Sequence, residues 1–127
     1  MDKAELLART KAFSLRILKL VDHLPRTPGG RAIANQLVRS GTAIGANYRA
    51  ACRSRSRAEF AAKLGIVAEE SDETVYWLEL IREGALLPEQ ALGEVLKEAD
   101  ELTAIFTSAR RTASKSNLKP QTSNISS

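Results

Sequence analysis

Apolar residues recur at three- and four-residue spacing in four stretches of this chain, and Pro- and Gly-containing breaks separate the stretches. This periodicity is typical of amphipathic helices, and no stretch shows the strict alternation of a strand. Either Ser54 or Ser56 can cap the third helix, and Glu59 completes a capping-box pattern with Ser56. The predicted helices cover about residues 2–22, 30–53, 56–83 and 89–112.

Short connections between four helices predict an all-α fold, an antiparallel up-down-up-down four-helix bundle formed by residues 1–112. The 127 residues are 43% hydrophobic, which suits one domain with a core of its own. Residues 113–127 are rich in Ser, Thr and Asn and contain few apolar side chains. We therefore expect a disordered C-terminal tail over 113–127.

Cysteine use and hydropathy indicate a cytoplasmic protein. Cys52 is the single cysteine, so no internal disulfide can form, and without a companion His it is expected to be an inert packed thiol. Charged residues interrupt the first twenty positions, which argues against a signal peptide. No run of about 18 apolar residues occurs, so we expect no membrane association.

Charge is strongly polarised along the chain. Residues 26–63 contain eight Lys or Arg against Glu59 alone, a net charge of +7, whereas residues 69–101 have a net charge of −9. Such asymmetry can create a basic surface that attracts a polyanion, or two complementary surfaces through which copies of the chain meet.

Arginines are densest around the junction of the second and third helices. The guanidinium fork suits phosphate oxygens, so this cluster is a candidate nucleic-acid-binding surface, with Arg26 and Arg31 expected nearby. The alternative is a solvated face, or salt bridges between subunits to the acidic third and fourth helices. Aromatic residues do not interleave with the cluster, which favours recognition of shape or backbone. The candidates are Arg26, Arg31, Arg49, Arg53, Arg55 and Arg57.

The second and third helices carry more apolar surface than one core-facing sector needs. Small residues flank the apolar stripe of the second helix and allow another helix to approach closely, while Trp77 lies off the main stripe of the third. A second helix or a second subunit must cover these sectors, and we predict an interface between subunits. The interface candidates are Val38, Gly41, Gly45, Tyr48, Ile66, Trp77 and Ile81.

Carboxylates in the third helix raise the question of a metal site. Glu70 and Glu73 are three residues apart, as in di-metal bundles, but such sites also use histidines, and His23 in the first loop is the single histidine. We therefore expect no metal, no cofactor and no catalytic residue, and the chain is not expected to be an enzyme. The expected structural partners of the two glutamates are Arg39, Lys63 or the amide of Asn47.

Three segments resemble a known family. They are RSGTAIGANYRAA at 39–51, SRAEF at 56–60 followed by Lys63 and Leu64, and YWLEL at 76–80 preceded by Glu70, Glu73 and Thr74. They resemble the four-helix-bundle proteins encoded within bacterial 23S ribosomal RNA intervening sequences, a group similar to the accessory variability determinant proteins of diversity-generating retroelements. The resemblance spans about residues 13–83 and implies a ring-shaped homopentamer without catalysis. In the retroelement relatives it also implies a basic surface that binds nucleic acid beside a reverse transcriptase.

Two functions follow as hypotheses. The first is a non-enzymatic, homopentameric bundle that offers a basic surface to RNA or DNA as an accessory or scaffold. The second is a self-assembling protein–protein interaction module in which the charge asymmetry serves only ring formation.

Overall fold

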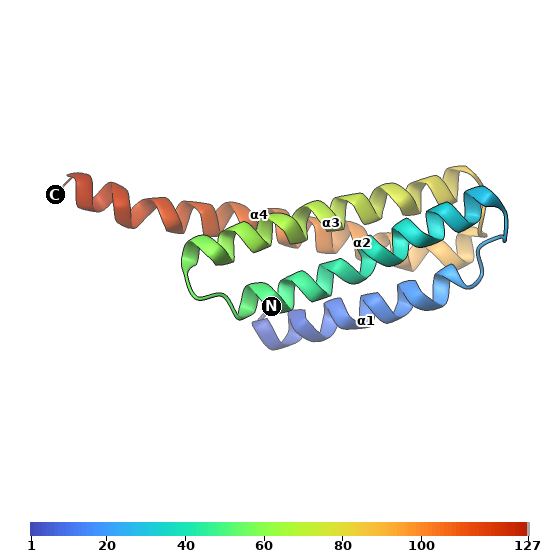
Figure 1. Cartoon of the computed structure of the whole chain (residues 1–127), viewed down its shortest axis with the longest axis horizontal. Coiled ribbons are helices and arrows are strands. Elements are labelled where there is room, and N and C mark those ends of the chain that lie inside the picture. Colours follow the sequence, from blue (N-terminus) through green and yellow to red (C-terminus); the bar gives the residue numbers. More distant parts are fainter. Residues whose placement is uncertain (127) are drawn as a thin grey trace.

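Four helices joined by short loops make up the part of the protein that the structure, a computed structural model, describes (Figure 1). The backbone is described for residues 1–126 and the side chains for residues 1–115, and this part contains no strand. The all-α prediction is therefore confirmed. The helices are α1 (Lys3–Val21), α2 (Pro28–Cys52), α3 (Arg57–Glu83) and α4 (Glu89–Ser126).

The helices run up, down, up and down, so the loops lie at two ends of a bundle (Figure 1). Each helix packs against its neighbour in sequence, and α1 and α4 meet over a smaller area. Arg9 spans that last contact, with Nε 2.7 Å from Glu98 Oε2 and Nη2 2.6 Å from Glu98 Oε1. The same Nη2 atom also lies 3.2 Å from Glu101 Oε1. One forked guanidinium therefore ties α1 to α4.

Ser56, not Ser54, is the residue that caps α3. Its backbone is extended, and its Oγ accepts a hydrogen bond of 3.1 Å from the N–H of Glu59. The Glu59 carboxylate reaches back to the N–H of Arg55, at 3.4 Å, one residue earlier than a regular capping box requires. The capping pattern therefore fixes where the α2–α3 loop ends.

The fourth helix is longer than the sequence predicts. Its apolar face continues past residue 112, since Ala113 lies one turn after Ala109 and both are partly buried against the core. The backbone remains helical to Ser126 and extends beyond the other three helices (Figure 1). The expected disordered tail, residues 113–127, lies mostly outside the described side chains, and its disorder stays a prediction.

Hydroxyl side chains inside the core find partners within their own helices. Thr10 and Ser71 are fully buried, and their hydroxyls donate to the carbonyl oxygens of the residues four positions earlier, at 2.9 and 2.8 Å. Ser40, which the sequence places on the apolar stripe of α2, shares a hydrogen bond of 3.0 Å with Thr74 of α3. The hydrogen bond between Ser40 and Thr74 therefore links α2 to α3 inside the core. The hydroxyl groups of these four buried residues all have partners.

Gly41 and Gly45 allow α1 to lie very close to α2. A Cβ atom at Gly41 would lie 3.0 Å from Cγ1 of Ile17 and 3.1 Å from its Cγ2, and one at Gly45 would lie 3.4 Å from the backbone of Thr10. Close packing therefore offsets the helix propensity that two glycines lose. The sequence predicts this close approach, and the helix that makes it is α1 of the same protomer.

We expect Gly41→Ala to lower the free energy of unfolding, although alanine is the better helix former by about 1 kcal/mol. The added methyl group would press on both γ-carbons of Ile17, which is fully buried and branched, and therefore cannot move aside cheaply. Gly93→Ala in α4 is the matched control. Nothing lies within 4 Å of its Cβ position, so this change should raise stability by about 0.5–1 kcal/mol. Urea unfolding followed by circular dichroism measures both, and equal gains would contradict a packing limit at Gly41.

Candidate nucleic-acid interface

The end of α2, the α2–α3 loop and the start of α3 meet the start of α1 at one end of the bundle (Figure 1). All six cations of this region are exposed, and we call this set the basic end. Four of them are the densest cluster of the sequence, and the structure brings these four together. The basic end consists of Lys3, Lys11, Arg49, Arg53, Arg55 and Arg57.

Arg26 and Arg31 do not belong to this surface. They lie at the α1–α2 loop and the first turn of α2, at the other end of the bundle (Figure 1). Eighteen residues of helix separate Arg31 from Arg49, a rise of about 27 Å. The expected proximity of Arg26 and Arg31 to the cluster is therefore not found.

Several arginines along the bundle have glutamate partners. Arg9, Arg39 and Arg82 each form ion pairs with glutamates, at 2.6 Å for Arg82 and Glu89. In the part of the chain whose side chains are described, Arg49 and Arg53 form no ion pair, and neither do Arg26 and Arg31 at the other end. What distinguishes the basic end is the number of cations that it brings together.

Two adjoining hollows open at the basic end, and both are lined by Tyr48, Arg57 and Phe60. One reaches toward Lys3 and the α2–α3 loop, and the other runs between α3 and α4. Sequence analysis missed Phe60 as a surface residue here because it continues the apolar stripe of α3. The sequence feature that could have identified Phe60 is its position one helical turn after Arg57, which places it beside the arginines.

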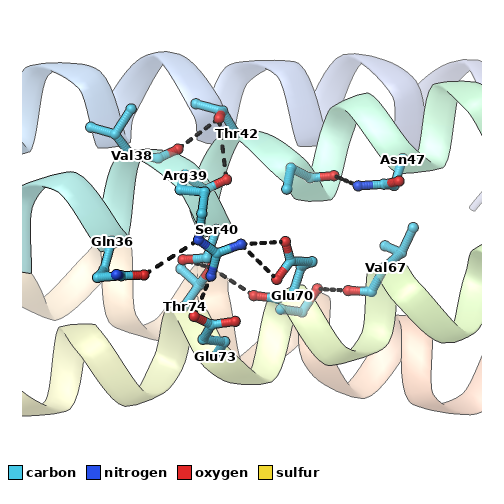
Figure 2. A network of polar contacts seen from close by, with 12 residues as sticks. Gln36, Val38, Arg39, Ser40, Thr42, Asn47, Val67, Glu70, Glu73 and Thr74 are labelled. Atoms are coloured by element: carbon cyan, nitrogen blue, oxygen red, sulfur yellow. Dashed lines mark hydrogen bonds and ion pairs between the residues drawn. The ribbon is translucent and has the colours of Figure 1, made fainter.

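Arg39 holds the two glutamates that the sequence singles out (Figure 2). Its guanidinium lies between them, with Nη1 2.9 Å from Glu70 Oε2 and Nη2 in contact with Glu73. Gln36 accepts a hydrogen bond from Nε at 3.3 Å, and the indole N–H of Trp77 donates to Glu73 at 3.2 Å. The expected pairing with Arg39 is confirmed. The other two expected partners bind elsewhere: Lys63 lies 3.8 Å from Glu59, and Asn47 donates to the carbonyl of Ala43.

The two glutamates titrate in opposite directions. Burial raises the pKa of Glu70 above its usual value of 4.5, and this outweighs the attraction of Arg39. Hydrogen bonds from Arg39 and from the Trp77 indole lower the pKa of Glu73. The same contacts with the glutamates raise the pKa of Arg39. The cluster is thus an ion pair between α2 and α3 whose carboxylates are already engaged.

The protomer's own packing accounts for four of the seven predicted interface residues. Ile81 is fully buried, and the rings of Tyr48 and Phe106 pack with centroids 5.3 Å apart. Gly41 and Gly45 face α1. The remaining candidates lie at or near the surface, and Ile66 is 45% exposed. These are Val38, Ile66 and Trp77.

The sequence model of the 23S rRNA-intervening sequence protein family matches residues 2–108, which include α1, α2, α3 and the first part of α4. The chain belongs to this family. The match starts before the segments quoted above and continues past them, so it also covers α1 and most of the packed part of α4. None of the curated proteins compared with the chain matches it.

A solved structure shares this fold. A crystal structure of a protein with unknown function from the S23 ribosomal protein family of Bacteroides thetaiotaomicron superposes with a TM-score of 0.79. The two sequences are 31% identical, and the match covers 87% of this chain and 99% of the other. Family membership therefore defines a fold, and the function must be argued from the surface. A search of the described helices for a long apolar segment finds none that could cross a membrane.

We expect Glu73→Gln to lower the free energy of unfolding at neutral pH by up to about 1 kcal/mol, the upper end for an ion pair whose side chains are 48% and 35% exposed to solvent. Because the folded pKa of Glu73 is lowered, its contribution is present above 4.5 and is lost as the pH falls through the lowered pKa. Glu70→Gln is the matched variant and should have a smaller effect at neutral pH. The raised pKa of Glu70 gives a contribution that is present at low pH and lost as the pH rises through that pKa.

Urea unfolding at neutral pH and at about pH 3 tests these signs. The Glu73 variant should lose less stability on acidification than the parent protein. A steeper acid loss in this variant would contradict the assigned direction.

Proposed function

We propose that the protein is a non-enzymatic, homo-oligomeric, cytoplasmic bundle that binds nucleic acid through the basic end and serves as an accessory or scaffold. The observation that carries this proposal is the convergence of exposed cations from α1, α2, the following loop and α3 on one end of the protomer. The family resemblance supports this proposal. In the retroelement relatives, the resemblance also implies a reverse transcriptase as a partner.

The side chains of the basic end are suited to binding phosphate groups. Arginine presents donors in a fixed fork that matches phosphate oxygens, and neutralised phosphates release counterions. Most acidic residues belong to the later part of α3 and the first part of α4, which lie toward the opposite end. A polyanion would therefore be attracted to one end of the protomer and repelled from the other.

Assembly would multiply this contact. Several basic ends in one ring bind a strand more tightly than one, because each later contact is intramolecular. Exposed apolar side chains support self-association: Ile66 is 45% and Tyr76 53% exposed on α3, and Trp77 beside them is only partly buried. By resemblance we propose a closed homopentamer, of about 69 kDa from five chains of 13.8 kDa.

The second candidate is a self-assembling protein–protein interaction module without a nucleic-acid ligand. The same exposed apolar residues favour it, together with the basic and acidic regions that could pair between neighbouring subunits. In this case Arg49, Arg53, Arg55 and Arg57 would face carboxylates of an adjacent copy.

Replacing Arg49, Arg53, Arg55 and Arg57 together by Gln should abolish binding of structured RNA and duplex DNA while helicity and assembly are retained. Four lost phosphate contacts should reduce the slope of log affinity against log salt by up to about four. Electrophoretic titration at two salt concentrations measures both effects. The matched control replaces Arg26 and Arg31 by Gln at the far end and should keep most of the affinity. A cluster variant that falls apart into monomers would favour the assembly module.

Light scattering of the purified protein should show an assembly several times heavier than 13.8 kDa at micromolar concentration. Trp77→Ala should weaken the assembly, because burial of a large aromatic side chain contributes more than a surface ion pair. Leu15→Ser on the outer face of α1 removes an apolar residue that is more exposed than Trp77 and should leave the assembly intact. A stable monomer in the parent protein would contradict self-association, and full assembly of the Trp77 variant would remove this residue from the interface.

A further inference from the structure

Phe60 lies where the two hollows of the basic end adjoin, since both are lined by its ring and by Tyr48 and Arg57. The hollow on the side of the α2–α3 loop measures about 560 Å³, within the range of sites that take small organic molecules. Phe60 is partly buried against the core, which restricts its side chain, and it also lines both hollows. An aromatic ring beside arginines is suited to stacking of a base.

The loop side of the same hollow is polar. Ser54 lines it, and its Oγ is buried without a hydrogen-bond partner among the described residues. This oxygen has almost no accessible surface, so a ligand can pair with it only when the Ser54 side chain rotates toward the hollow. Lys3 and Arg55 add positive charge at the rim, and α3 begins here with its N–H groups directed outward. One hollow thus combines an aromatic wall, a polar atom and an anion-attracting rim.

Two carboxylates, those of Asp2 and Glu59, lie near this site without lining it. Asp2 caps α1 by accepting a hydrogen bond of 2.8 Å from the N–H of Glu5. Glu59 is directed toward Lys63, 3.8 Å away, and toward the N–H of Arg55. Its charge is therefore partly compensated, and the cations that line the hollow outnumber the two carboxylates. An anionic group can approach from the loop side.

We propose that this hollow receives one unpaired nucleotide of a bound strand, with the base against Phe60 and the phosphate at Arg55 and the start of α3. The proposal rests on the proposed function and deepens it, because it names single-stranded nucleic acid as the preferred ligand. Bases of a regular duplex are stacked and paired, and they cannot enter the hollow unless a base is flipped out. A single strand offers its bases without this cost.

Phe60→Leu tests the stacking contact, since leucine keeps an apolar side chain against the core but removes the ring. The probes are a fluorescein-labelled oligothymidylate strand and a labelled duplex of equal length, measured by fluorescence anisotropy. We expect roughly a tenfold loss of affinity for the single strand, from one lost base–aromatic stack, and no loss for the duplex. Leu15→Ala is the control, because Leu15 is an exposed apolar residue on the outer face of α1 that lines neither hollow, and both affinities should be unchanged.

The outcomes separate this inference from the proposed function. Binding of both probes by the parent protein with no effect of Phe60→Leu overturns the inference and leaves the nucleic-acid function standing. Equal losses for strand and duplex also overturn it, since they assign Phe60 to the structure of the basic end. A parent protein that binds neither probe overturns both proposals. Circular dichroism and thermal unfolding verify that the leucine variant is folded.

Nuclear magnetic resonance gives a second, independent test on the parent protein. Thymidine monophosphate should shift the backbone amides of residues 54–60, and inorganic phosphate at equal concentration should shift them less. Ser54→Ala should reduce the response to the nucleotide. Equal shifts by nucleotide and phosphate identify a simple anion site and overturn the proposed base contact.

Discussion

The close approach of α1 to α2 at Gly41 and Gly45 determines much of the remaining structure. Because these two glycines have no side chains, Ile17 and Thr10 of α1 approach the α2 backbone closely. Helix α1 can then bury its apolar stripe in the shared core although its contact with α4 is small. The same approach places the first turn of α1 beside the end of α2, so that Lys3 joins the arginines at the basic end.

Ion pairs divide the protomer into two electrostatic regions. Glutamates of α3 and α4 engage arginines from other segments, as Glu73 engages Arg39 and Glu98 engages Arg9. These pairs connect helices, whereas several cations at the α2–α3 junction are left facing solvent. These ion pairs therefore hold helices together, whereas the exposed cations of the basic end are the basis of the proposed polyanion contact.

Sequence patterns predict those features that depend on one helix at a time. Periodicity locates the helices, and the spacing between Ser56 and Glu59 locates a cap. Packing between helices is harder to predict from the sequence. A helical wheel shows that Gly41 needs a close neighbour, but it does not show whether that neighbour is α1 or another subunit. The expectation that Arg26 and Arg31 lie near the cluster is wrong because residues of one charged stretch can lie at opposite ends of a helix. Helix α2 has 25 residues and is about 37 Å long. Phe60 continues the apolar stripe of α3, and this pattern does not show that the core ends beside it.

The contacts of Arg9 with α4 have a consequence for the local unfolding of α1. Segments with few buried contacts open at a lower free energy than the whole domain, and α1 is the shortest helix and meets α4 over a small area. Detachment of its first turns would break the contacts of Arg9 with α4, expose Leu6, and remove Leu6 and Lys3 from the walls of the two hollows. The first turns of α1 therefore form one side of the basic end, and their local unfolding would widen that end.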